Sequence, residues 1–296
     1  EICACLVGSE MCIRDRTVIY GNFAKVKNWG VDLAVDYGKQ INRDLSIQFK
    51  GTFTFARNRV METDEAADIR PALSAVGKPL NTLWGYVADG LYIDEAGIAN
   101  NPTSTLGNIT IAAGDVKYVD QPDVNGNYDG QIDSDDRVAI GHPTIPEIIY
   151  GFGPSITWKK WDFSVFFQGQ ANVSLMMSGF EPFGTQSKNN VLEWIAEDYW
   201  SKENQNPNAK YPRLSSQSNE NNYQTNTLWL ADRSFLKLRS IELYYKFPQI
   251  WVKKSKILSN AKIYVRGVDL LCFDKINIAD PEVYGATYPL TRSVVA

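Results

Sequence analysis

The chain has 296 residues with 30 basic and 34 acidic side chains, so it lacks the excess of Lys and Arg that neutralises phosphates, and nucleic acid is not an expected partner. No segment approaches the roughly 18 consecutive apolar residues of a membrane-spanning helix, so only strands could cross a membrane. Aromatic residues make up 12% of the sequence, and Asn, Gly and Ser crowd the segments between them, which is typical of one large all-β unit.

The first sixteen residues differ from the remainder. They hold Cys3, Cys5 and Cys12, and only Cys272 lies elsewhere, so no disulfide framework or metal-binding cysteine pair spans the chain. Residues 5–16 resemble translated sequencing-adapter sequence, and the segment has no signal-peptide pattern. We predict that residues 1–16 are non-native or disordered and make few contacts, and that residues 17–296 are the folded part of a chain whose natural N-terminus lies upstream. The alternative is a short native strand.

The first predicted hairpin joins residues 31–37 to residues 44–56 through a connector at 38–43. Apolar and polar side chains alternate with period two in both segments, which predicts strands with one apolar and one polar face. The apolar face carries Val31, Leu33, Val35, Tyr37, Leu45, Ile47, Phe49, Phe53 and Phe55, and the polar face carries Asp32, Asp36, Gln48 and Lys50.

A long polar connection follows, from about residue 58 to 147, and contains a candidate metal site. Oxygen-bearing side chains recur at the spacing of an EF-hand calcium loop, with Gly130 at the sixth position. The predicted ligands are Asn125, Asn127, Asp129, the Gln131 carbonyl, Asp133 and Asp136. A neutral Asn at the first position and a short Asp at the twelfth weaken the expected affinity. The alternative is a metal-free turn held by its own side-chain to backbone hydrogen bonds.

Two more hairpins are predicted further along the chain. One runs from about residue 148 to 170 and turns at Lys159 and Lys160, with Asp162 and Gln168 on its polar face. The other joins residues 235–247 to residues 261–273 through a connector at 248–260. A second long polar connection, from about residue 172 to 228, separates them. Short turns therefore alternate with long loops.

This asymmetry favours an outer-membrane barrel over a soluble sandwich. Residues 44–56 form a run about twice the modal soluble strand, and such barrels have short turns on one side and long loops on the other. The apolar face would then meet lipid, and the polar face would line the lumen. Aromatic residues near the strand ends fit an interfacial girdle as well as ordinary packing: Trp29, Tyr150, Trp158, Trp161, Tyr244 and Phe247.

Catalytic chemistry has little support. His142 is the only histidine and lies in a Gly-His-Pro turn without a recognisable serine or cysteine partner. The acidic pair Glu193 and Glu197 lies at helical spacing beside Trp194, as expected of a short amphipathic helix and not of a glycosidase pair. Loop aromatics could contact a sugar or a partner protein, with packing inside the loops as the default interpretation; they are Trp84, Tyr86, Tyr92, Phe180, Phe183 and Trp229.

From about residue 28 to the end, the sequence resembles the C-terminal barrel portion of the SusC/RagA-like family of TonB-linked outer-membrane proteins of Bacteroidetes. Several segments carry the resemblance, in order and at family-like spacing. They are residues 114–120 (GDVKYVD), 129–137, 140–143, 163–169 (FSVFFQG), 206–214 (NPNAKYPRL), 229–248, 263–271 and 280–283. Asp269 stands where the family often has Asn, from which we infer no loss of function.

The resemblance implies part of a transmembrane barrel of about 22 strands that, with an upstream plug, imports glycan fragments or peptides. It implies a SusD-like lipoprotein partner, the TonB complex, contact with outer-membrane lipid, and no enzymatic activity. Residues 291–296 would begin the last strand, so we expect the plug and the closing strand to be missing here. The imported substrate and the oligomeric state do not follow from the sequence.

Two hypotheses from other classes remain at this point. One is a soluble, secreted β-rich glycan-binding module that carries the calcium loop. The weaker one is a glycosidase domain. A barrel predicts a single curved sheet with an outward apolar face, whereas a soluble module predicts that this face is buried between two sheets.

Overall fold

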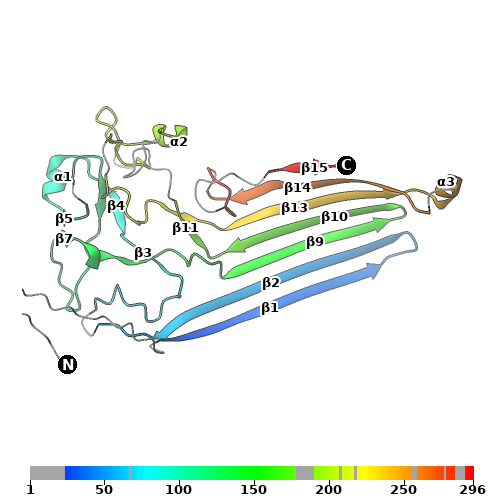
Figure 1. Cartoon of the computed structure of the whole chain (residues 1–296), viewed down its shortest axis with the longest axis horizontal. Coiled ribbons are helices and arrows are strands. Elements are labelled where there is room, and N and C mark those ends of the chain that lie inside the picture. Colours follow the sequence, from blue (N-terminus) through cyan, green and yellow to red (C-terminus); the bar gives the residue numbers. More distant parts are fainter. Residues whose placement is uncertain are drawn as a thin grey trace, which may run out of the picture.

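The computed structural model describes residues 24–66, 69–107, 109–177, 190–206, 209–216, 219–254, 259–276, 278–283 and 291–296. Its main element is one antiparallel sheet of seven strands in the order β1-β2-β9-β10-β13-β14-β15 (Figure 1). The strands are β1 (Lys25–Gln40), β2 (Leu45–Glu62), β9 (Ile148–Trp158), β10 (Trp161–Ala171), β13 (Phe235–Lys246), β14 (Lys262–Asp274) and β15 (Ser293–Val295). Within the described residues the sheet stays open, with β1 and β15 at its edges. The all-β, barrel-type fold predicted from the sequence is confirmed.

The three predicted hairpins are present, with two differences. β2 continues to Glu62, six residues beyond the expected end, because the longer β1 offers backbone partners as far as Lys25. The connector between β13 and β14 contains a short helix, α3 (Gln249–Lys254), that the alternation pattern does not predict. The turn at Lys159 lies where expected, and its φ of 55° closes the tight connection between β9 and β10.

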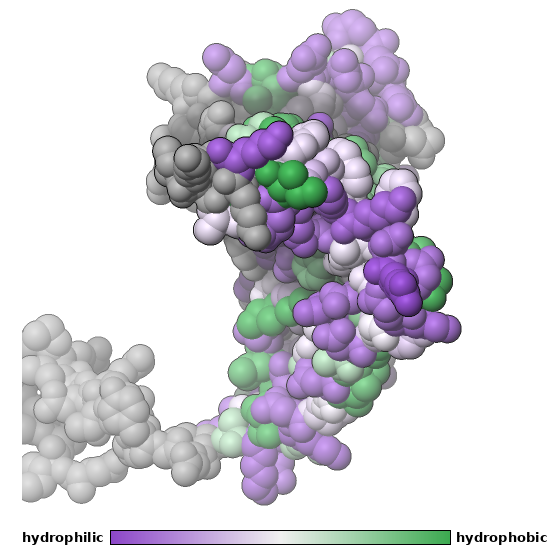
Figure 2. Space-filling view, turned by 90° about the vertical axis from the view of Figure 1, so that its right-hand side faces the viewer, coloured by the Kyte–Doolittle hydropathy of each residue, from purple (hydrophilic) through white to green (hydrophobic). Residues whose placement is uncertain are grey.

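The sheet is a single layer, and its apolar face is exposed. Opposed residues of an antiparallel pair share a face, so the register aligns Leu33 with Phe53 and Tyr37 with Phe49. Leu33 is 57% exposed and Phe53 39% exposed, and no second sheet covers them in the described part of the chain. Viewed along the strands, the described chain follows a curve (Figure 2). The prediction of a packed soluble sandwich is therefore not met.

Short turns and long connections lie at opposite ends of the sheet (Figure 1). One end holds the turns after β1, β9 and β13. The other holds the described parts of the connections 63–147, 172–234 and 275–292. Their small elements are β3 (Leu83–Gly85), β4 (Ala88–Leu91), α1 (Glu95–Ala99), β5 (Thr103–Ser104), β6 (Val116–Tyr118), β7 (Gln131–Ile132), the 3-10 helix η1 (Ser134–Asp136), β8 (Val138–Ile140), β11 (Ser174–Met176), α2 (Glu193–Ala196) and β12 (Leu230–Asp232).

The two clusters of buried hydrophobic residues lie in the loops and not on the sheet. The connections 63–147 and 172–234 pack against each other, and their described parts are called the loop cap below. One cluster brings together Tyr86, Leu91, Val116, Tyr118, Ile132, Trp200 and Ala209. A second brings together Ile195, Tyr211 and Trp229. The loop cap therefore has clustered buried residues, whereas buried apolar residues on the sheet, such as Leu238, belong to neither cluster.

Two expectations concern other parts of the chain. Among the described residues, no helix is long and apolar enough to span a membrane. Residues 1–16 lie outside the described residues, so the proposed non-native segment and its boundary stay predictions.

Candidate functional site

The polar face of the sheet is the first part of the candidate site. The register places Asp36 opposite Lys50 on β1 and β2, and their charged groups lie 3.7 Å apart. On β13 and β14, Glu242 lies opposite Arg266, and the carboxylate is 2.9 Å from the guanidinium. Charges of both signs thus line one face from strand to strand, as expected of a wall that faces water or a polar solute.

A compact ionic cluster lies on this face near the loop end of β13. Lys237 Nζ lies 2.7 Å from carboxylate oxygens of both Asp280 and Glu282. Arg239 contacts Glu282 and also Asp269, the latter at 2.8 Å. The segment 278–283 thus folds back onto the polar face and is held there by side chains of β13.

The loop cap is organised around a buried carboxylate. Asp115 is 0% exposed and accepts hydrogen bonds from Arg213 Nε at 2.7 Å and Arg213 Nη2 at 3.1 Å. Asn219 and Asn222 donate to the same carboxylate at 2.8 and 2.9 Å. The contacts join residues about a hundred positions apart in the sequence, so Asp115 links the two connections that make the loop cap. A buried charge paired in this way costs several kcal/mol to strip of its partners.

The Asn-rich run 219–226 supplies most of the remaining links. Asn222 Oδ1 accepts from the Val116 backbone at 2.8 Å, and Asn221 Nδ2 donates to the Val116 carbonyl at 3.0 Å. Tyr118 donates its hydroxyl to the Asn221 carbonyl at 2.5 Å, and burial raises the pKa of Tyr118. The side-chain amides of Asn221 and Asn222 therefore hydrogen-bond to the β6 backbone as a neighbouring strand would.

Sequence reasoning did not single out Asp115, Arg213 or the buried asparagines as site residues. A signal was available, because residues 114–120 and 206–214 are two of the segments that carry the family resemblance. They meet directly, since Arg213 N donates to the Gly114 carbonyl at 2.8 Å. Gly114 has a φ of 89°, and a Cβ there would lie 2.3 Å from the Trp200 ring. Only glycine fits this crossing.

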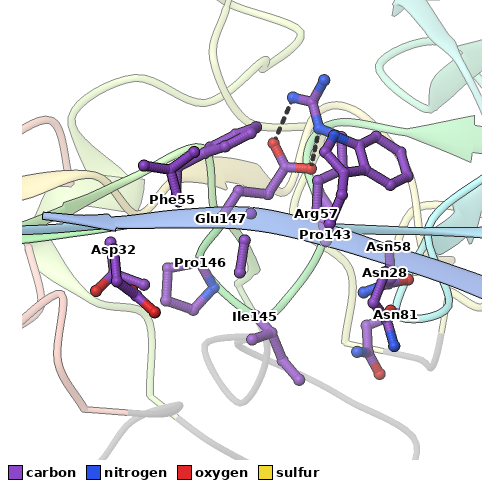
Figure 3. Close-up of a pocket in the computed structure, with 15 residues that line it drawn as sticks. Asn28, Asp32, Phe55, Arg57, Asn58, Asn81, Pro143, Ile145, Pro146 and Glu147 are labelled. Carbon is purple, nitrogen blue, oxygen red and sulfur yellow. Dashed lines mark hydrogen bonds and ion pairs between the residues drawn. The ribbon is translucent and has the colours of Figure 1, made fainter.

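A cavity of about 430 Å³ lies where β1 and β2 reach the loop cap (Figure 3). Its wall includes the segment before β9, where Glu147 accepts two hydrogen bonds from Arg57, at 2.7 and 2.6 Å. These bonds hold the pKa of Glu147 below its usual range. Asn172, just after β10, donates to the same carboxylate at 3.3 Å. Glu147 thus ties β2, β9 and β10 together, and the cavity is lined by amides and apolar groups beside Asp32.

The predicted calcium loop is bonded internally. Asp129 accepts from the Gln131 backbone at 2.8 Å and from Arg70 at 2.9 Å, and both contacts lower the pKa of Asp129. Asp133 and Asp136 form a capping box at η1, and burial raises the pKa of Asp136. Gly130 has the positive φ of 75° expected at the sharp turn.

Arg70 takes a place that the loop spacing alone does not anticipate. Its guanidinium lies 3.7 Å from Asp135 and 3.6 Å from Asp136, in addition to Asp129. No group of three or more acidic, His or Cys side chains in the described residues is arranged to hold a metal ion. The loop geometry is thus that of the self-bonded turn, with Arg70 as the counter-cation, and calcium binding stays a prediction.

Calcium at millimolar concentration should protect residues 120–136 of the full-length protein from proteolysis if the loop binds it, because the metal would replace Arg70 at Asp129. The Asp129→Ala variant should lose this protection. Asp89→Ala, which removes an exposed carboxylate paired with Lys117 outside the loop, should keep it. Identical digestion with and without calcium would leave the self-bonded turn as the only explanation of the spacing.

The six aromatic residues predicted to contact a substrate or partner have different surroundings. Tyr86 and Tyr92 are 3% exposed and Trp229 is 5% exposed, so their rings pack inside the loop cap, as the default interpretation holds. Trp84 is half-buried in β3. Phe180 and Phe183 lie outside the described residues. A direct role for any of them in binding stays a prediction.

Comparison with known proteins matches most of the chain. It is 23% identical over 273 residues to TonB-dependent receptor P3 of Formosa agariphila, covering 88% of this chain and 26% of that protein. It is 31% identical over 172 residues to TonB-dependent receptor P26 of the same organism, covering 57% of this chain and 16% of the relative. The chain therefore spans about a quarter or less of these curated relatives. No family model matches.

Solved structures agree in fold. The RagAB peptide transporter is 22% identical, with a TM-score of 0.65 over 89% of this chain and 27% of that one. The RagAB peptide importer in the "closed-closed" state is 21% identical, with a TM-score of 0.68 over 92% of this chain and 29% of that one. All of these proteins are named as receptors, transporters or importers. The resemblance stated from the sequence is thereby confirmed.

Proposed function

We propose that this chain, which is similar in sequence to TonB-dependent receptors and shares the fold of the RagAB peptide transporter, forms part of the wall and outer loops of an outer-membrane nutrient importer. The observation that carries the proposal is the single curved sheet with an exposed apolar face and a charged opposite face. Lipid would cover the first face, and the transported solute would pass the second.

The finer proposal concerns energy, partner and substrate. A TonB complex would drive import through upstream parts of the full-length protein, and a SusD-like lipoprotein would meet the loop cap. Two considerations support this: the family resemblance and the likeness to a two-component peptide importer. The substrate would be a peptide or an oligosaccharide, because the polar face offers hydrogen-bonding groups and charges of both signs.

The soluble glycan-binding alternative fits the structure less well. Residues such as Val31, Val35 and Tyr37 are each more than half exposed on one face. An apolar surface of this extent is not kept in water by a soluble module. The loop cap packs around its own buried residues. No other part of the described chain covers the apolar face of the sheet.

Import should depend on the proton gradient and on the lipoprotein. Cells that express the full-length protein with its neighbouring lipoprotein should take up labelled peptides or oligosaccharides, and dissipating the gradient or deleting the lipoprotein gene should abolish uptake. The loop variant Asp123→Ala, at a partly exposed position, serves as the control and should transport normally. Uptake that persists without the gradient would contradict the proposal.

A further inference from the structure

Two cationic side chains of β13 bind one carboxylate of the same chain on the polar face of the sheet. Arg239 donates through both terminal nitrogens to the two oxygens of Glu282. Lys237 Nζ lies 2.7 Å from one of those oxygens. A forked guanidinium with a second cation beside it is the arrangement that proteins use to bind a free carboxylate.

The segment that brings Glu282 here is held by further contacts. Arg233 donates to the backbone carbonyls of Pro281 at 2.5 Å and Glu282 at 3.0 Å. Asp280 adds its own carboxylate to Lys237 at 2.7 Å. The side chain of Lys237 is 3% exposed, whereas that of Glu282 is 21% exposed. Lys237 therefore belongs to the sheet, and the Glu282 carboxylate approaches it from the solvent-exposed side.

Arg239 would keep side-chain partners if Glu282 left. Arg239 is also held by Asp269 at 2.8 Å and by the side-chain oxygen of Gln168 at 3.0 Å. Lys237 lies near the loop end of β13, and its backbone is paired on both sides, opposite Gln168 of β10 and Cys272 of β14. A site whose guanidinium is fixed by neighbours that remain, beside a lysine on a paired strand, is preorganised for another carboxylate.

We propose that Lys237 and Arg239 form a carboxylate-binding site on the inner wall, occupied here by the chain's own Glu282. A ligand with a free carboxylate, such as a peptide C-terminus, binds the site by displacing the segment 280–282. The inference rests on the proposed import function, because it assigns the site to a solute that passes the wall. Glu282 then acts as an internal competitor, and a ligand has to exceed its effective concentration.

Cys272 is a natural reporter for this displacement. It is the only cysteine among the described residues, it lies on the same face as Lys237, and it is partly buried. The alkylation rate of Cys272 by neutral iodoacetamide can be followed by peptide mass mapping in the purified full-length protein. N-acetyl-trialanine supplies a free carboxylate, and its C-terminal amide is the matched neutral probe.

The carboxylate peptide at saturating concentration should raise the alkylation rate by roughly fivefold or more, which is the lower range for coupling between two binding events. The amide should leave the rate unchanged. Arg239→Gln should abolish the response, and Lys237→Met is the second variant in case the first does not fold. Glu282→Gln should raise the basal rate and remove the response, whereas Glu62→Gln, at an exposed pair with Lys25, should behave as the wild type.

An equal response to both peptides, or no response to either, would overturn the proposal and leave the cluster as an anchor of segment 278–283. The assay needs no transport, so its failure is separable from failure of the proposed function. If uptake is normal and Cys272 does not respond, only the carboxylate site is refuted. If the wild-type protein shows no gradient-dependent uptake, the import function is refuted instead.

Discussion

Replacing Asp115 with Ala is expected to destabilise the loop cap by about 3–5 kcal/mol, the usual cost of removing one partner from a buried charge pair. The substitution strips Arg213 of both its hydrogen bonds to Asp115 and leaves amide donors of Asn219 and Asn222 without this acceptor. The contacts between the two connections should then loosen together. Hydrogen exchange of residues 115–118 and 219–226 in the full-length protein would measure the effect.

The matched control is Asp123→Ala. Asp123 is a partly exposed carboxylate that accepts only local hydrogen bonds, from Asn125 and Asn127. Its replacement should change exchange in the buried segments by less than about 0.5 kcal/mol, as is usual for surface positions. Equal protection in the two variants would show that Asp115 does not hold the loop cap together.

The Leu33→Arg variant should assemble poorly into the outer membrane, whereas Ala34→Arg should assemble normally. Leu33 lies near the middle of β1 on the apolar face, and Ala34 lies next to it on the polar face, opposite Thr52. A charged side chain on the lipid side of a barrel costs about 2–4 kcal/mol at the bilayer midplane, whereas a substitution on the lumen side is tolerated.

The measurement is the fraction of full-length protein recovered, folded, in outer-membrane preparations. Because the two positions are adjacent in the same strand, expression, charge and sequence context are nearly identical. A similar loss in both variants, or a larger loss for Ala34→Arg, would mean that the faces are assigned the wrong way round.

The sheet could be predicted from the sequence because a strand has the shortest period that a sequence can show. In the strands that contain Leu33 and Phe53, apolar residues occupy every second position and polar residues lie between them. The faces, hairpins and turns therefore follow from the local pattern alone. The ends of the strands are predicted less accurately from the sequence. β2 extends to Glu62 through Arg57 and Arg59, whose place in the alternation is hidden because charged side chains here occupy the face that is apolar at Phe53.

The loop cap could not be predicted in the same way. Its central contact joins Asp115 to Asn222, and no periodicity connects positions that far apart. Tyr86 and Trp229 were candidates for binding because aromatic residues in polar loops are often exposed for function. They are buried because the two connections pack on each other and make a core where each alone would have none.

The acidic loop illustrates a similar limit. The spacing from Asn125 to Asp136 defines which oxygens could meet a metal ion, but it contains no information about Arg70, which lies fifty-five residues before Asn125. A cation supplied from elsewhere in the chain can neutralise the same carboxylates. Spacing therefore predicts the turn more securely than the ligand.

The position of the buried core also sets an order of folding. Within a hairpin the paired strands are close in the sequence, so β1 can pair with β2, and β9 with β10, as soon as each hairpin is present, whereas the pairs β2–β9 and β10–β13 form across the long connections. The loop cap joins chain segments on either side of the β9–β10 hairpin, and closing such long loops is slow. Asp115 should therefore acquire its partners only after β10 has paired with β9. Once they have formed, the contacts within the loop cap oppose the separation of the β9–β10 hairpin from the sheet.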